Sequence, residues 1–129
     1  GIYEFPTIFQ MISTIESRID KELPFTEVIK TTFPMGSMTG APKIKAMELI
    51  EKYETIKRGL YSGSVGYITP NGDFDFNVVI RSLQINSNHN YASFITGGAI
   101  TILSNTEQEY EECFVKAQGL LKSLQTTIE

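Results

Sequence analysis

The chain is short of the features that mark several large classes of protein. Its single cysteine, Cys113, can form no internal disulfide, so we expect a reducing, cytoplasmic setting. No apolar run reaches the roughly 20 residues of a transmembrane helix, and no signal peptide is visible. With 11 basic and 15 acidic residues the net charge is −4, which argues against nucleic acid as a partner, because binding a phosphate backbone needs a basic face. A chain of 129 residues can bury one core, on the order of two-thirds of its unfolded surface.

Helical patterns dominate the first part of the chain. Residues 7–20 carry an apolar stripe at helical spacing, with Thr7 as a cap, and the stripe comprises Ile8, Met11, Ile12, Ile15 and Ile19. A short second helix is predicted over residues 24–30. A third is predicted over residues 41–52, where Pro42 suits the first turn because its φ is already helical and its missing N–H costs no hydrogen bond.

Strand patterns begin at about Leu60. Strands are predicted over residues 61–69, 74–81 and 91–103, with a reverse turn at Pro70-Asn71-Gly72-Asp73 between the first two. Neighbouring strands joined by short loops predict an antiparallel β-meander with flanking helices, an α+β fold.

A long C-terminal helix should follow a cap at Asn105 or Thr106. We expect its apolar face to lie on the sheet; that face comprises Tyr110, Phe114, Ala117, Leu121 and Leu124.

The most informative segment is Gly-Ser-Met-Thr-Gly-Ala-Pro-Lys at residues 36–43. Its small residues would let a ligand approach the start of the following helix, where unpaired N–H groups and the helix dipole favour an anion. On spacing alone, a tight turn that begins a helix explains the segment equally simply.

This segment belongs to a longer pattern that resembles a known family. Residues 34–47, Pro-x-Gly-Ser-x-Thr-Gly-Ala-Pro-Lys-x-x-Ala-Met, are similar to the signature of the chorismate-utilising enzymes, which include anthranilate, aminodeoxychorismate, isochorismate and salicylate synthases. Further blocks follow in the family's order at residues 58–67, 75–82, 96–99 and 109–116. The resemblance implies that residues 1–129 are a C-terminal fragment of one catalytic domain with the larger anthranilate synthase component I-like fold. A first residue other than methionine, Gly1, agrees with this expectation.

Glu109, Glu112 and Lys116 lie three and then four residues apart on the expected C-terminal helix, in a band about 60° wide. Two carboxylates one turn apart can offer oxygen ligands to a hard cation such as Mg²⁺, and a lysine can bind a substrate carboxylate. The residues alone fit an exposed Glu112–Lys116 ion pair as well. The resemblance implies that Glu112 binds Mg²⁺ directly and that Glu109 supports it or binds the metal through water. It also implies that Lys116 contacts the substrate and that a further glutamate ligand comes from outside this chain.

Arg81 is predicted on the strand face that also carries Asn77 and Val79. There it can clamp a carboxylate ligand or pair with an acidic neighbour such as Asp75. By resemblance, Arg81 clamps a carboxylate of chorismate and Tyr61 donates a hydrogen bond to the same ligand.

Gly97 and Gly98 interrupt the third predicted strand. Glycines there permit either a close approach of the backbone to a ligand or a β-bulge. The resemblance makes both glycines part of the chorismate site, with Thr39 as the hydroxyl contact of the glycine-rich segment.

Two features bear on the branch of the family. Gln10 stands where anthranilate and salicylate synthases carry a histidine, and an amide cannot shuttle a proton as an imidazole does. Together with Asp-Phe-Asn at residues 75–77, this is similar to the aminodeoxychorismate synthases of the folate pathway. Anthranilate synthase component I, of tryptophan biosynthesis, and a non-catalytic chorismate-binding remnant are the alternatives.

The folate branch implies amination of chorismate to 4-amino-4-deoxychorismate, the precursor of p-aminobenzoate. A lysine nucleophile would come from a part of the enzyme outside this chain, and ammonia from a glutamine amidotransferase subunit or domain. We therefore expect no catalysis from this chain alone.

Overall fold

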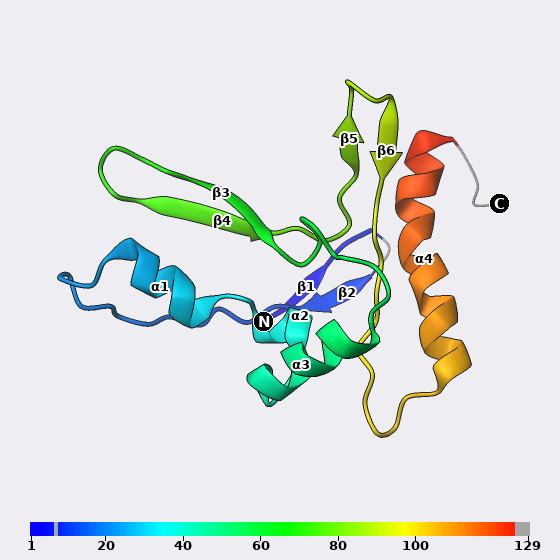
Figure 1. Cartoon of the computed structure of the whole chain (residues 1–129), viewed down its shortest axis with the longest axis horizontal. Coiled ribbons are helices and arrows are strands. Elements are labelled where there is room, and N and C mark those ends of the chain that lie inside the picture. Colours follow the sequence, from blue (N-terminus) through cyan, green and yellow to red (C-terminus); the bar gives the residue numbers. More distant parts are fainter. Residues whose placement is uncertain (7, 126–129) are drawn as a thin grey trace. The chain divides into compact units, whose positions relative to one another are not determined.

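The computed structural model describes residues 1–6 and 8–125 as a mixture of helices and small antiparallel sheets (Figure 1). The helices are α1 (Phe25–Thr32), α2 (Gly36–Thr39), α3 (Lys43–Tyr53) and α4 (Thr106–Leu124). The strands are β1 (Ile2–Glu4), β2 (Phe9–Met11), β3 (Ser64–Ile68), β4 (Phe74–Val78), β5 (Gln84–Asn86) and β6 (Tyr91–Ser93). The chain divides into two compact units, Gly1–Phe33 and Pro34–Glu129.

The first unit contains a short hairpin where a helix was predicted. β1 pairs with β2 in antiparallel register, with Ile2 opposite Met11, and residues 12–20 have no regular structure. The predicted helix over residues 7–20 is therefore wrong for the described part of that range, and its cap, Thr7, lies outside the described residues. β-Branched side chains lose freedom in a helix, and a short helix needs a surface on which to pack its apolar face. Ile15 on that face is 92% exposed, so no such surface is present around it among the described residues.

The second predicted helix is confirmed as α1, and the third as α3. The glycine-rich segment before α3 forms the short helix α2. Pro42 precedes α3 as its N-cap with extended ψ of 138°, so it does not lie within the first turn as predicted.

The hairpin of β3 and β4 forms at the predicted place, with Ser64 opposite Val78 and the turn at residues 70–73. Both strands are shorter than predicted, because residues 61–63 form a turn before β3 and β4 ends at Val78. Gly66 permits this pairing, because a Cβ there would lie 2.1 Å from the carbonyl oxygen of Asp75 and 2.5 Å from the ring of Phe76.

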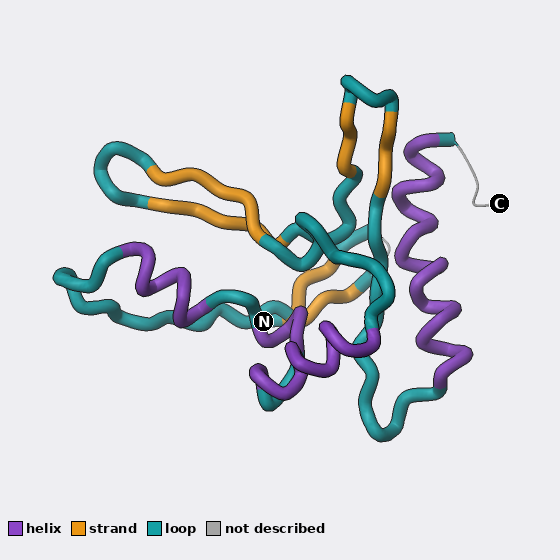
Figure 2. The backbone as a smooth tube through the Cα atoms, viewed as in Figure 1, coloured by secondary structure: helices purple, strands orange, loops and turns teal. Residues whose placement is uncertain are grey.

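The single meander is not observed. β5 and β6 form a hairpin of their own, so the described residues contain three separate two-stranded sheets (Figure 2). The predicted strand over residues 91–103 is wrong beyond Ser93, because β6 ends there and the segment with Gly97 and Gly98 has no regular structure. Glycines supply no side chain to pack and weaken a strand, which explains this early end.

Helix α4 begins at the predicted place, but only part of its predicted core face is covered. The side chain of Asn105 caps it by accepting a hydrogen bond from the backbone N–H of Gln108 at 3.1 Å. Ala117 is only 2% exposed, whereas Tyr110, on the predicted core face, is 66% exposed. Leu121 of the predicted face is half-covered, and the other half-covered residues of α4 lie beside that face and comprise Glu109, Cys113, Lys116 and Leu120.

Little apolar surface is removed from solvent. Among the described residues, only Val79 and Ala117 are buried, so the single sizeable core that the composition predicts is not present in this part of the chain. No described helix has both the length and the apolar character that crossing a membrane would require.

Candidate functional site

Most of the predicted site residues come together beside α4, within the second unit. We call this group the α4 cluster: Tyr61, Gly97, Gly98, Glu109, Glu112 and Lys116. Nζ of Lys116 donates a hydrogen bond to the carbonyl oxygen of Gly97 at 3.0 Å and pairs with Oε1 of Glu112 at 2.7 Å. The helix thus places the ammonium group of Lys116 between a carboxylate one turn away and the backbone of Gly97. The spacing predicts the pair with Glu112, whereas no sequence pattern indicated the contact with Gly97.

The two glycines are in close contact with other members of the cluster. A Cβ added to Gly97 would lie 2.9 Å from the hydroxyl of Tyr61, and one added to Gly98 would lie 2.8 Å from Oε2 of Glu109. Since residues 97 and 98 lie outside any strand, a β-bulge does not account for these glycines, and their small size admits the side chains of Tyr61 and Glu109. The approach of a ligand to the same backbone stays a prediction. Oε1 of Glu109 accepts a hydrogen bond from Ser104 at 2.9 Å, a contact that no sequence pattern indicated.

The chemistry of the cluster suits a hard cation. Within the described part of the chain, the hydrogen bond of Glu109 and the ion pair of Glu112 engage Oε1 of each carboxylate, so Oε2 of each could take a ligand. Mg²⁺ commonly takes one or two carboxylates and completes its shell with water and substrate oxygens. No group of three or more His, Cys, Asp or Glu side chains that could hold a metal occurs in the described part of the chain, so further ligands would have to come from elsewhere.

The ion pair between Glu112 and Lys116 is the arrangement that the residues alone also predict. Both side chains are partly open to solvent, so the pair contributes little stability by itself. An exposed pair of this kind can exchange its partners for a cation and an anionic ligand.

Arg81 and Thr39 lie outside the group of contacts that defines the α4 cluster. Arg81 is exposed, follows the end of β4, and has a positive φ of 50°, so the prediction that it lies on a half-buried strand face is wrong. The strand ends early because the backbone turns at Ile80, whose N–H donates to the carbonyl of Val78. The hydroxyl of Thr39 donates to the carbonyl of Met35 at 3.1 Å within the turn that forms α2.

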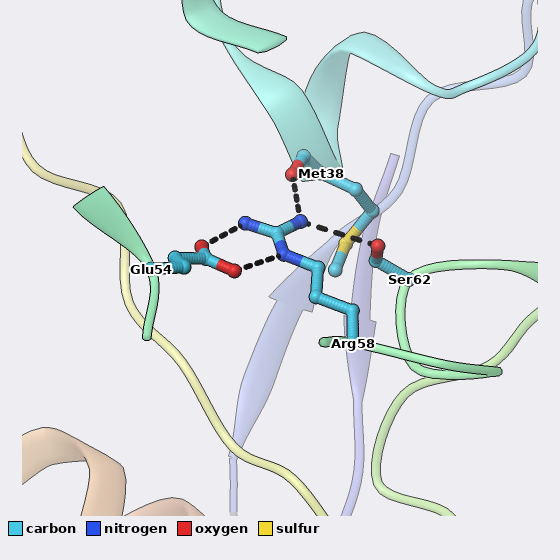
Figure 3. Close-up of polar contacts among 4 residues, drawn as sticks. All are labelled: Met38, Glu54, Arg58 and Ser62. Atoms are coloured by element: carbon cyan, nitrogen blue, oxygen red, sulfur yellow. Dashed lines mark hydrogen bonds and ion pairs between the residues drawn. The ribbon is translucent and has the colours of Figure 1, made fainter. Parts of the chain in front are cut away.

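Arg58 makes an extensive set of polar contacts in the second unit, and sequence reasoning gave it no role (Figure 3). Nε and Nη2 donate to the two carboxylate oxygens of Glu54 at 2.7 and 2.5 Å. Nη1 donates to the carbonyl of Met38 at 2.9 Å and to Oγ of Ser62 at 3.2 Å. The hydrogen bonds from Arg58 lower the pKa of Glu54, and those to Glu54 raise the pKa of Arg58. A planar guanidinium group has donors on two edges and can hold such partners together. In the sequence, the only indication of a role for Arg58 was its position within the motif block at residues 58–67.

Comparison with known proteins decides the family. The sequence profile described as chorismate binding enzyme matches residues 1–122. The chain belongs to the chorismate-binding enzyme family. The resemblance drawn from the motifs is therefore confirmed.

Relatives within the chorismate-binding family fall in more than one branch. The chloroplastic aminodeoxychorismate synthase of Arabidopsis thaliana is 42% identical over 118 residues, which are 92% of this chain and 13% of the relative. Aminodeoxychorismate synthase component 1 of Salmonella typhimurium is 38% identical over 94% of this chain and 26% of its own length. Anthranilate synthase component 1 of Acinetobacter calcoaceticus is 33% identical over 96% of this chain and 24% of its own length. The chain thus spans between 13% and 26% of the length of these relatives.

The contact between Glu54 and Arg58 should make the stability of this family member depend on pH in acid. The pKa of Glu54 lies below its ordinary 4.5, first because of the hydrogen bonds from Arg58; partial burial opposes the shift and the charge of Arg58 adds to it. A carboxyl group with a lowered pKa in the folded state stabilises the fold above its unfolded-state pKa, and this contribution is lost as pH falls through the folded pKa. We therefore expect Glu54→Gln to lower the melting temperature at neutral pH and to have progressively less effect below pH 4.5.

Thermal unfolding followed by circular dichroism over a series of pH values measures this difference. Glu51→Gln is the matched control, because Glu51 pairs with Lys57 at an exposed position. A difference between wild type and Glu54→Gln that stays constant into acid would contradict the assignment.

Proposed function

We propose that the polypeptide carrying this chain is an aminodeoxychorismate synthase component I, which aminates chorismate to 4-amino-4-deoxychorismate for p-aminobenzoate and folate biosynthesis. The observation that carries the proposal is the α4 cluster, in which a lysine, two carboxylates and two glycines lie close together. The relatives named aminodeoxychorismate synthase, at 42% and 38% identity, support this branch over anthranilate synthase at 33%.

Chorismate is an anion with carboxylates, and the cluster offers groups that recognise one. Lys116 would donate to a substrate carboxylate, since its ammonium carries three donors. The hydroxyl of Tyr61 and the backbone of Gly97 and Gly98 would line the same space. Arg81 is exposed, and its guanidinium can form a bidentate pair with a carboxylate that reaches it. A further hydroxyl contact, from α2, would be that of Thr39.

Mg²⁺ is the cofactor that the donor set fits. Glu112 would hold the ion directly through Oε2, and Glu109 would support it from one turn away. When bound, the ion would neutralise negative charge on a substrate carboxylate. The chain's own residues would bind and orient the anion beside it.

Other parts of the activity would come from outside residues 1–129, which we propose to be a C-terminal fragment of the larger chorismate-binding fold. A lysine nucleophile, a further glutamate ligand, and strands that complete a meander would belong to that remainder. A glutamine amidotransferase subunit or domain would supply ammonia. Exposed apolar side chains such as Ile15, Ile102 and Leu103 support the presence of covering segments, because surfaces of this kind mark interfaces. A cytoplasmic location is also part of this proposal, although the name of the plant relative assigns that protein to the chloroplast.

The product identifies the function. Full-length protein incubated with chorismate, Mg²⁺ and an ammonium salt should form a product that yields p-aminobenzoate only after aminodeoxychorismate lyase is added. The direct appearance of anthranilate would assign the protein to the tryptophan branch instead. Binding of chorismate without turnover, in the presence of the amidotransferase and glutamine, would mark a non-catalytic remnant. A reaction of residues 1–129 alone should show no turnover.

A further inference from the structure

Arg58 connects two segments that each carry a proposed substrate contact. Nη1 donates to the carbonyl of Met38, the residue beside Thr39 in α2, and to the hydroxyl of Ser62, the residue beside Tyr61 (Figure 3). Its remaining edge is held by Glu54, which directly follows α3. Both edges of the Arg58 guanidinium group therefore donate hydrogen bonds to groups of the protein, and the side chain is only 23% exposed.

The turn that carries Tyr61 depends on such support. Ser62 has a positive φ of 62°, a conformation that costs free energy for any residue other than glycine and persists where surrounding contacts enforce it. Two contacts do so here: the N–H of Ser62 donates to the carbonyl of the buried Val79 at 3.0 Å, and its hydroxyl accepts from Arg58. The N–H of Tyr61 donates to the carbonyl of Arg58 itself, which closes the turn.

This turn places Tyr61 in the α4 cluster. The guanidinium of Arg58 lies 6.0 Å from the centre of the Tyr61 ring, and the hydroxyl at the far end of that ring lies against Gly97. The carbonyl of Gly97 in turn accepts the hydrogen bond from Lys116. A continuous series of contacts thus runs from Arg58 to the cation that would bind the substrate.

We infer that Arg58 is a positioning residue for chorismate, which fixes Tyr61 and the glycine-rich segment relative to each other without touching the substrate. The inference rests on the proposed function. Lysine cannot replace arginine in this role, because its donors radiate from one nitrogen and cannot serve a carboxylate on one side and a carbonyl and a hydroxyl on the other.

The test is Arg58→Lys in the full-length protein, with steady-state kinetics and direct titration of chorismate. We expect KM and the dissociation constant for chorismate to rise about tenfold, with kcat changed by less than about threefold, as for lost binding contacts. A residue with a merely structural role would lower the active fraction, and therefore kcat, and would leave KM unchanged. In a Tyr61→Phe background the further effect of Arg58→Lys on KM should be smaller than in wild type, since part of that effect acts through the position of the Tyr61 hydroxyl.

Lys57→Ala is the matched control, because Lys57 is the neighbouring basic residue and its pair with Glu51 is exposed at 87% and 76%; its KM should equal that of wild type. If Arg58→Lys fails to fold, Glu54→Gln is the alternative variant, because it weakens the paired hydrogen bonds between the Arg58 guanidinium and residue 54. It should raise KM about threefold by the same reasoning. An active wild type whose KM is unaffected by either variant overturns the inference and leaves the proposed function standing. A wild type that neither binds nor converts chorismate overturns the proposed function, and the inference falls with it.

Discussion

Glu112→Gln in the full-length protein should lower kcat/KM for chorismate by about 100-fold or more, a loss typical of removing one electrostatic contact at a reacting site. The amide removes the negative charge that pairs with Lys116 at 2.7 Å, and it is a poorer ligand for a hard cation than a carboxylate. The concentration of Mg²⁺ that gives half-maximal activity should rise at least about tenfold, as expected when a metal ligand is weakened. Initial rates over a matrix of chorismate and Mg²⁺ concentrations measure both effects.

Glu111→Gln is the control for this experiment. It makes the same change of charge one residue away on α4, at an exposed position about 100° around the helix from Glu112. Equal losses in the two variants would mean that overall charge, rather than the site, governs the result. If Glu112→Gln retains activity and its Mg²⁺ requirement, the contact with Lys116 is a surface ion pair alone, worth only about 0.3–0.5 kcal/mol.

The parts of the site that could be predicted from sequence are those that depend on local geometry. The spacing of Glu109, Glu112 and Lys116 places them on one side of any helix that includes them, whatever packs against it. The cap at Asn105 is likewise local, because one side chain satisfies a nearby N–H group. Local patterns also found the turn between β3 and β4.

What covers each element could not be read from the sequence. The apolar stripe of α4 correctly predicted that Ala117 and Leu121 are covered, but Tyr110 and Phe114 of the same stripe are exposed. The covered side extends instead to Glu109 and Lys116. The segment with Gly97 and Gly98 lies there, and its own lack of side chains permits that contact. The prediction of a helix over residues 7–20 was wrong for a related reason. The spacing of its apolar residues specifies an apolar face, but it does not specify a surface on which that face can pack.

The hydrogen-bond partners of Arg58 also could not be predicted from the sequence. Met38 is twenty residues before Arg58 and accepts the hydrogen bond through its backbone carbonyl. Every residue type has such a carbonyl, so the sequence gives no indication of the contact. A motif can therefore include such an arginine without indicating which groups accept its hydrogen bonds.

Gly98→Ala should produce the second large loss, because the new Cβ would lie 2.8 Å from Oε2 of Glu109 and 3.8 Å from that residue's carbonyl. A carboxylate at the end of a flexible side chain could normally move away, but Oε1 of Glu109 is held by Ser104 at 2.9 Å. Relief requires either that this hydrogen bond breaks or that the glycine segment shifts and strains the bond between Gly97 and Lys116. Either movement disturbs the oxygen that would support the metal, so we expect kcat/KM to fall by about 10- to 100-fold, as for loss of a supporting group around a metal.

Gly119→Ala separates this effect from a general intolerance of alanine. Gly119 lies in α4, and a methyl group added there would meet no described atom within 4 Å, so the substitution fills open space. Replacing a helical glycine by alanine should stabilise the protein by about 0.5–1 kcal/mol and raise the melting temperature without altering kcat/KM. Kinetics and thermal unfolding of both variants decide the matter: full activity in Gly98→Ala would mean that Glu109 has room to move. Its position would then not depend on the glycine segment, and the contact between them could not be part of a preorganised site.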